Sequence, residues 1–148
     1  MPGAVFLEGE KVNLRTIEEE DIEFLRDGIN NPEIREFLTA RKPVNLEQEK
    51  EFFQDIISNQ KDIHLAICIE EKIIGIVSLE EVEDEIRVAK IGIWIETDHH
   101  GKGYGTEVAK LITGYGFNEL NYHRMMARAY KDNKGSNRIW EKLGFQKE

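Results

Sequence analysis

Hydrophobic and polar residues alternate with a period of two through the middle of the chain. The alternation covers residues 62–70 (DIHLAICIE), 73–83 (IIGIVSLEEVE) and 87–96 (RVAKIGIWIE). Three such strands with short connections predict an antiparallel meander. Within each strand, every second residue lies on the same face of the sheet. Residues predicted to share a face are Ile63, Leu65, Ile67 and Ile69 in the first strand, Ile74, Ile76, Ser78 and Glu80 in the second, and Ile91, Ile93 and Ile95 in the third.

The pattern before the meander predicts a strand followed by three helices. The strand is expected over residues 11–17, and the helices over 18–29, 32–38 and 46–59. Thr16 and Glu19 have the spacing of a capping box, as do Asn45 and Gln48, and Asn31 precedes a proline suited to a first helical turn. The third helix is predicted to bury an apolar stripe made of Phe52, Phe53, Ile56 and Ile57.

The pattern after the meander predicts a helix, a strand and a last helix. Val108, Leu111, Ile112 and Tyr115 repeat at helical spacing, residues 123–130 favour a strand, and residues 134–145 favour a helix closed by Gly144 with Phe145 packed behind it. The element order is therefore β, α, α, α, β, β, β, α, β, α. It predicts one domain over residues 1–148 of the mixed α/β (α+β) class, with helices flanking a largely antiparallel sheet.

Composition limits the classes of protein to which the chain can belong. Its 148 residues carry a net charge of −9, which argues against nucleic-acid binding. No signal peptide and no apolar run of membrane-spanning length is found, so we expect a cytoplasmic protein without a membrane partner. The single cysteine, Cys68, excludes a disulfide within the chain and lies in an apolar strand, where a buried small side chain is expected.

The charge is unevenly distributed between the two parts of the chain. Residues 1–86 hold 9 Lys and Arg against 22 Asp and Glu, a net of −13, whereas residues 87–148 hold 11 against 7, a net of +4. This asymmetry suggests two ligands of opposite sign, a cationic one for the first part and an anionic one for the second. The alternative interpretation is that most of these charges only keep the exposed faces of helices in contact with solvent.

Three glycines, Gly101, Gly103 and Gly105, stand between the last meander strand and the next helix. The spacing fits neither a Walker loop nor a dinucleotide fingerprint. Glycines at a helix N-terminus allow successive amides to line a concave site for a pyrophosphate, to which Lys102 would add a positive charge. A flexible turn without a ligand is the alternative.

Three segments of the chain resemble the GNAT superfamily of acetyl-CoA-dependent N-acetyltransferases. HGKGYG (100–105) is similar to the pyrophosphate loop of the family, with His100 where Gln or Arg is usual. NKGSNRIWEKLGF (133–145) resembles a second family motif. LEGEKVNLRTIEEEDIEFL (7–25) with NNPEIREFL (30–38) is similar to the branch of ribosomal-protein N-terminal and spermidine acetyltransferases.

The resemblance implies how acetyl-CoA or CoA would bind. In the family, the strand before the loop and the strand after the following helix splay apart, and the pantetheine arm pairs with backbone in the gap. The cofactor-binding residues implied here are Ile93, Trp94 and Ile95 in the strand, His100, Gly101, Lys102, Gly103, Tyr104, Gly105 and Thr106 in the loop and helix start, and Asn133 and Ser136 in the second motif.

The implied reaction is acetyl transfer to a primary amine, either of a cationic small molecule such as a polyamine or of a protein N-terminus. Cys68 has no evident activating partner, so direct attack by the amine is expected. The catalytic candidates are Glu80 and Glu81, one of which is expected to face the acceptor and act as a base, and Trp140, which stands where the family often has a tyrosine acid. The four histidines show no metal-ligand spacing, and no metal is predicted.

Two features leave a second function open, that of a non-catalytic acetyl-CoA-binding module. The first is Trp140, because an indole cannot donate a proton as an acid at neutral pH. Members of this branch also continue past Gly144 and Phe145 with a strand hairpin, whereas three residues follow here. A shortened chain, an absent hairpin, or a neighbouring subunit that closes the sheet edge in a homodimer would each account for the difference.

Overall fold

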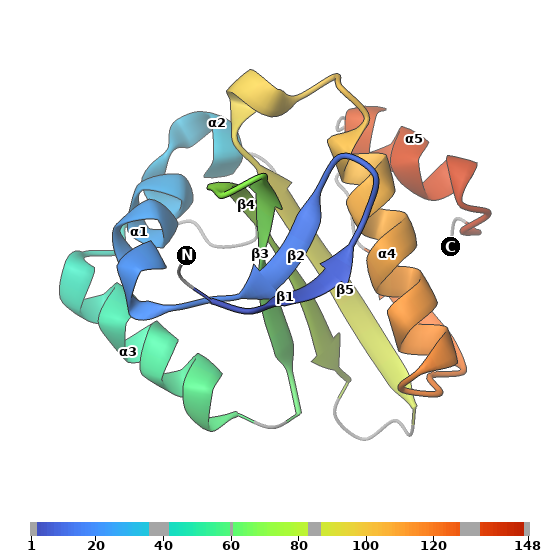
Figure 1. Cartoon of the computed structure of the whole chain (residues 1–148), viewed down its shortest axis with the longest axis horizontal. Coiled ribbons are helices and arrows are strands. Elements are labelled where there is room, and N and C mark those ends of the chain that lie inside the picture. The colour runs from blue at the N-terminus through green and yellow to red at the C-terminus, as the bar shows by residue number, and fades with distance from the viewer. Residues whose placement is uncertain (1–2, 36–41, 60, 83–86, 128–133, 147–148) are drawn as a thin grey trace.

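The computed structural model describes residues 3–35, 42–59, 61–82, 87–127 and 134–146. Its six-stranded sheet has the order β1-β2-β3-β4-β5-β6, and all neighbours are antiparallel except β5 and β6 (Figure 1). The strands are β1 (Val5–Glu8), β2 (Asn13–Thr16), β3 (Ile63–Ile69), β4 (Lys72–Glu81), β5 (Val88–Ile95) and β6 (Arg124–Ala127). The helices are α1 (Ile22–Asn30), α2 (Pro32–Arg35), α3 (Leu46–Ser58), α4 (Tyr104–Asn118) and α5 (Lys134–Lys142), with 3-10 turns at Glu19–Asp21 and Thr97–His99.

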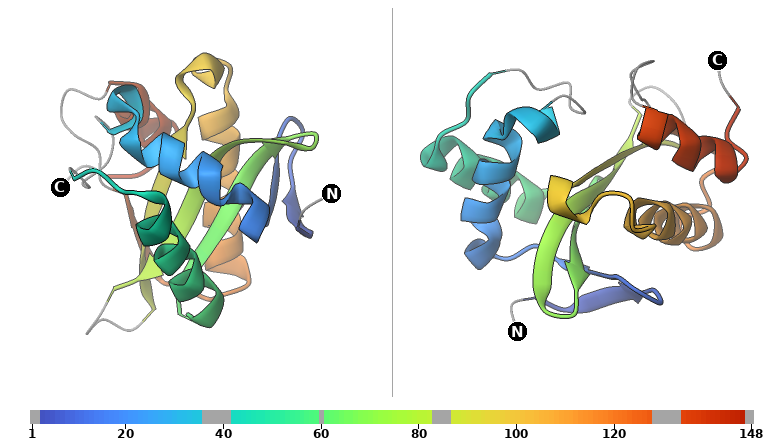
Figure 2. Two further views of the ribbon diagram at one scale, coloured as in Figure 1. Left: turned by 90° about the vertical axis from the view of Figure 1, so that its left-hand side faces the viewer. Right: turned by 90° about the horizontal axis from the view of Figure 1, so that it is seen from above.

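The sheet lies between two groups of helices, as the view from above shows (Figure 2). Helices α1 to α3 cover one face, and α4 and α5 cover the other. The larger buried cluster lies between the sheet and α4, and includes Leu65, Ile67, Val77, Leu79, Ile91, Val108 and Ile112. A smaller cluster on the opposite face includes Ile17, Ile22, Leu25, Phe53, Cys68 and Ile76. The predicted mixed α/β class with a largely antiparallel sheet is confirmed.

The predicted meander is confirmed as β3, β4 and β5, but the hairpin partner of β2 was missed. The sequence predicted one strand at residues 11–17, whereas β1 pairs with β2 from Val5 to Glu8. Val5 and Phe6 are both exposed, so this short edge strand lacks the alternation that would reveal it.

The predicted face of β4 is wrong at Ile74 because the strand contains a bulge. Ile67 pairs with Gly75 while Cys68 pairs with Ile73, so Ile74 is an extra residue in β4. Ile74 therefore belongs to the larger cluster, and Ile76 belongs to the smaller one. Beyond the bulge the alternation resumes, with Ser78 and Glu80 on the face of Ile76.

The helix caps agree with the sequence at one helix and differ at another. Asn45 Oδ1 accepts a hydrogen bond from Gln48 N at 2.9 Å, and Gln48 Oε1 accepts one from Asn45 N, which confirms the box before α3. The predicted Thr16–Glu19 box is wrong. Thr16 Oγ1 instead donates to Glu18 Oε2, and Asp21 accepts from Glu18 N at 2.8 Å.

The buried stripe of α3 also differs from the prediction. Phe53 is buried and Ile56 half-buried, but Phe52 is 40% exposed and Ile57 60% exposed. Glu49, one turn before Phe53, is buried instead, with 1% of its surface exposed. The side of α3 that meets the sheet therefore includes a carboxyl group that an apolar pattern cannot predict.

The predicted end of α5 is confirmed. Gly144 has a φ of 85° and donates to Glu141 O, and Phe145 N donates to Trp140 O at 2.9 Å. These two bonds form a Schellman motif, and the rings of Trp140 and Phe145 lie 4.9 Å apart. No helix in the described ranges is long and apolar enough to cross a bilayer.

Candidate active site

The glycine segment forms a tight loop that leads into α4. Gly101 and Gly103 have φ values of 76° and 84°, a backbone conformation that residues with a Cβ atom rarely adopt. The first hydrogen bond of α4 runs from Glu107 N to Gly103 O, so the amides of Tyr104, Gly105 and Thr106 precede the first amide that donates to the helix. Such amides at the positive end of a helix dipole are suited to bind a phosphate.

Gly105 has a different role from the other two glycines. A Cβ at this position would lie 2.9 Å from Ile139 Cδ1, so the missing side chain lets α5 pack against α4. Gly101 meets nothing within 4 Å of its hypothetical Cβ, and Gly103 meets only Lys11 Nζ, at 3.6 Å. Two of the three glycines therefore shape the loop, and the third serves the packing of two helices.

Contacts with the end of β5 and with the β1–β2 turn hold this loop in place. His100 Nε2 lies 2.7 Å from Ile95 O, which connects the loop to the end of β5. Lys11, in the turn between β1 and β2, places Nζ 3.4 Å from Lys102 O. The Glu107 carboxylate accepts hydrogen bonds from three successive amides of the same turn, those of Glu10, Lys11 and Val12, at 2.7 to 3.1 Å. The β1–β2 turn is thus fixed beside the helix N-terminus.

The strand that leads to the loop extends beyond its last described partner. Pairing between β5 and β6 ends at Ile91 and Ala127, while β5 continues to Ile95. Ile93, Trp94 and Ile95 therefore lie beyond the part of this pairing that the structure describes. Asn133 lies outside the described residues, and Ser136 is within α5. Tyr104 and Thr106 are half-buried at the start of α4.

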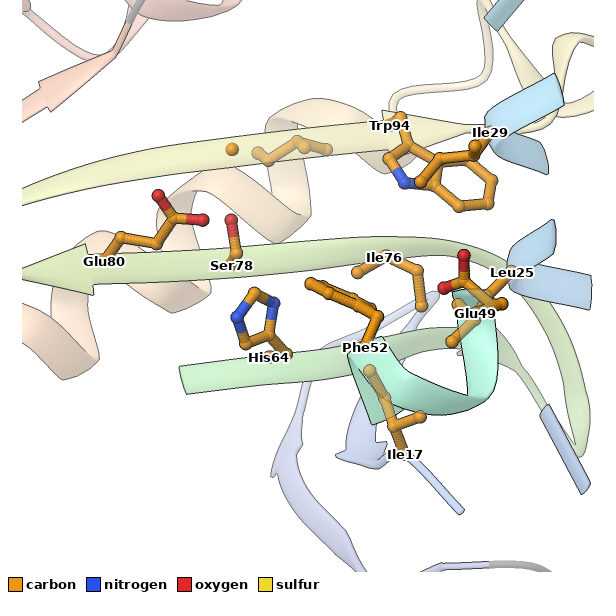
Figure 3. A pocket seen from close by; sticks show the side chains of 12 residues that line it. Ile17, Leu25, Ile29, Glu49, Phe52, His64, Ile76, Ser78, Glu80 and Trp94 are labelled. Atoms are coloured by element: carbon orange, nitrogen blue, oxygen red, sulfur yellow. The ribbon is translucent and has the colours of Figure 1, made fainter. Parts of the chain in front are cut away.

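A cavity of about 210 Å³ opens on the α1–α3 side of the sheet (Figure 3). Its wall comes from α1, α3 and the strands β3, β4 and β5. The lining residues are Ile17, Leu25, Ile29, Glu49, Phe52, His64, Ile76, Ser78, Glu80, Gly92, Ile93 and Trp94. Trp94 stacks on Phe24 with ring centres 5.5 Å apart, and Gly28 of α1 leaves room for its indole. The cavity thus adjoins the end of β5 that leads into the glycine loop.

One end of the cavity is polar. His64 of β3 pairs in register with Ser78 of β4, and Glu80 follows on the same face, as the side chains in Figure 3 show. Burial lowers the pKa of His64, an effect that the charges of Glu80 and Asp62 partly offset. His64 is therefore neutral near pH 7 and able to accept a proton. Lys90 Nζ lies 3.9 Å from Glu80 Oε2.

The other end is apolar except for Glu49. The Glu49 carboxyl group lies among Leu25, Ile76 and Trp94 (Figure 3). Its Oε1 atom is fully buried and has no hydrogen-bond partner among the described residues. Burial raises the pKa of Glu49, because an apolar environment disfavours the charged form.

The other predicted catalytic residues lie outside the lining of this cavity. Glu81 is on the opposite face of β4, where its Oε1 accepts a hydrogen bond from Tyr122 Oη at 3.1 Å. That bond adds to burial in raising the pKa of Tyr122 to about 12. Trp140 is part of the larger core cluster, with 9% of its surface exposed. A catalytic role for either residue stays a prediction.

The site prediction from the sequence missed the three other polar side chains of the cavity wall, which are Glu49, His64 and Ser78. Ser78 was predicted on the face of Glu80, but nothing local indicated that His64 would lie beside it or that this face would border a cavity. Glu49 is one of five acidic residues between positions 47 and 62, and only its burial distinguishes it. Within the described ranges, no group of three or more His, Cys, Asp or Glu residues could hold a metal ion.

Comparison with known proteins agrees with this architecture. Residues 11–146 match the family model of the acetyltransferase (GNAT) domain. The chain belongs to the GNAT acetyltransferase family. It is therefore an acyltransferase of the class that uses acetyl-CoA, as the resemblance of its loop implied.

Individual relatives place the chain within this family. It is 28% identical to the spermidine N(1)-acetyltransferase of Escherichia coli (strain K12) over 137 residues, which cover 93% of this chain and 74% of that protein. It is 35% identical to the probable N-acetyltransferase YjcK of Bacillus subtilis (strain 168) over 99 residues, 65% of this chain and 55% of that protein. The fold is similar to that of spermidine N-acetyltransferase from Vibrio cholerae in complex with CoA and spermine, with a TM-score of 0.87, 23% identity and coverage of 95% and 83%.

Proposed function

We propose that this protein transfers the acetyl group of acetyl-CoA to a primary amine of a cationic small molecule, such as a polyamine, or of a protein N-terminus. The observation that carries the proposal is the cavity beside β5, which joins a polar end with Glu80, Ser78 and His64 to the strand segment that leads into the glycine loop. The names of the spermidine acetyltransferase relatives support a small amine as acceptor. A homodimer stays a prediction.

The glycine loop and the end of β5 fit the donor. The free amides at the start of α4, together with Lys11 and Lys102, would hold the pyrophosphate, and the backbone of Ile93, Trp94 and Ile95 would pair with the pantetheine arm. When bound, acetyl-CoA supplies the acetyl group as a thioester. The nearness of the loop, this backbone and the cavity supports one continuous donor and acceptor site.

The polar end of the cavity would handle the proton of the acceptor. An amine is protonated near pH 7 and must lose a proton before its nitrogen can attack. Glu80 would accept this proton, directly or through a water molecule, and neutral His64 beside it offers a second acceptor. The Ser78 hydroxyl can hold the amine in place by a hydrogen bond. Cys68 is buried with a raised pKa, because burial disfavours the thiolate, which supports direct transfer without a cysteine intermediate.

The test is a steady-state assay with acetyl-CoA and a panel of amines, including spermidine, 1,4-diaminobutane and a basic peptide with a free N-terminus. Glu80→Gln should lower kcat by about 10²- to 10⁴-fold, the usual range for loss of a general base. Glu81→Gln is compared directly with it, since Glu81 is bonded to Tyr122 on the opposite face, and its effect should be smaller. CoA binding without turnover of any amine would instead favour a non-catalytic binding module.

A further inference from the structure

Glu49 is a buried acid without an ion-pair partner among the described residues. It has 1% of its surface exposed, and its Oε1 atom bonds to no group among the described residues. Burying an unpaired polar group costs roughly 1–3 kcal/mol in protein mutational data, and more if the group is charged. Glutamine or methionine at this position of α3 would avoid the charge. The stability of the fold therefore does not explain a carboxyl group here.

The position of Glu49 in the cavity makes its carboxyl group suitable for binding a ligand. Its carboxyl group lines the end opposite to Glu80, and the wall between the two includes Phe52 and Ile76 (Figure 3). The other ionisable groups in the described wall are His64 and Glu80, so the cavity offers no cation to Glu49. An apolar stretch with a carboxyl group at each end fits an aliphatic stem with a cation at each end.

We propose that Glu49 binds the second ammonium group of the acceptor and thereby selects aliphatic diamines over monoamines. This inference deepens the proposed function and rests on it. One amine of such an acceptor lies beside Glu80, Ser78 and His64, the alkyl stem contacts Phe52 and Ile76, and the far ammonium group forms an ion pair with Glu49. Burial raises the pKa of Glu49 in the empty cavity, whereas a cation next to the carboxyl group favours the ionised form. Binding of a diamine should therefore lower the pKa of Glu49.

Calorimetry on the CoA-saturated protein tests this assignment without requiring turnover. The probes are 1,4-diaminobutane and n-butylamine, which share the same stem but differ in the second amine. The wild type should bind the diamine about 10- to 100-fold more tightly, the range expected for a hydrogen bond to a charged group. Glu49→Gln should lose this preference and leave the affinity for n-butylamine unchanged. At mildly acidic pH, titrations in buffers of different ionisation enthalpy should show more proton release with the wild type than with Glu49→Gln.

Glu51→Gln is the matched control, because Glu51 is an exposed carboxylate on the same helix and its loss changes the net charge equally. It should retain the preference for the diamine. Equal diamine affinity in the wild type and Glu49→Gln, or a wild type that does not distinguish the two amines, would overturn the assignment. Selective binding of the diamine without acetyl transfer would instead contradict the proposed function and leave the role of Glu49 standing.

Discussion

Two acidic side chains are buried in the part of the chain that the structure describes, and their surroundings differ. Asp21 forms two hydrogen bonds of 2.8 Å with the Arg15 guanidinium and a third with Glu18 N. The hydrogen bonds with Asp21 also raise the pKa of Arg15, against the effect of burial. Glu49 has no such partner. The first carboxylate belongs to a closed structural network, whereas the second borders an open cavity.

Glu49→Gln should stabilise the folded protein at neutral pH. The pKa of Glu49 is higher in the folded state than in the unfolded chain, where it is near 4.5. The free energy of unfolding therefore falls as the pH rises from the unfolded pKa of Glu49 through its folded pKa. Glutamine does not titrate, so the variant does not lose this stability. Thermal unfolding should show a higher Tm for the variant at pH 7 and a smaller difference near pH 4. A difference that does not change with pH would show that the pKa of Glu49 is not raised in the folded state.

At the scale of elements, one carboxylate joins the first hairpin to the helix that follows the glycine loop. Glu107, in the first turn of α4, accepts bonds from amides 95 to 97 positions away in the sequence. The turn that it holds carries Lys11, whose Nζ lies beside Lys102 and Gly103. The position of a cation at the proposed phosphate site thus depends on a contact between two elements.

Glu107→Gln should therefore weaken both the fold and the donor site. The amide side chain keeps one acceptor oxygen but places an NH₂ group against backbone donors, so we expect a loss of about 1–3 kcal/mol in the free energy of unfolding. CoA affinity should fall as well, because the hairpin no longer holds Lys11 at the loop. Chemical denaturation and calorimetry measure the two effects. Glu71→Gln, at an exposed position in the β3–β4 turn, is the control. Unchanged CoA affinity would remove Lys11 from the donor site.

At the scale of the whole molecule, the sheet separates the cavity from the larger core. Helices α1 to α3 and strands β1 to β4 belong to the part of the chain with a net charge of −13. The cavity opens on the side of those helices. Acidic surroundings raise the local concentration of cations, so this distribution favours capture of a cationic acceptor.

Salt should therefore weaken the capture of a diamine more than that of a neutral amine. Raising NaCl from about 0.1 M to about 1 M shortens the Debye length from about 10 Å to about 3 Å. We expect kcat/KM for 1,4-diaminobutane to fall several-fold across this range while that for a weakly basic, uncharged aromatic amine changes little. Parallel salt titrations measure both. An equal response of the two acceptors would show that the acidic charge does not guide binding.

Elements with local signals could be predicted from the amino-acid sequence alone. The meander follows from a period of two, the start of α3 from Asn45 and Gln48, the end of α5 from Gly144, and the family from the loop and the second motif. Each of these signals depends on residues that are close in the chain, where side-chain period and backbone conformation act directly.

Which residues share a site depends instead on long-range packing and pairing. The bulge at Ile74 changed the face of β4, the packing of Ile139 gave Gly105 its role, and α3 buried Glu49 where an apolar stripe was expected. The same holds for the register that sets His64 beside Ser78. Burial and pairing depend on segments that are distant in the chain, so no local pattern can determine them.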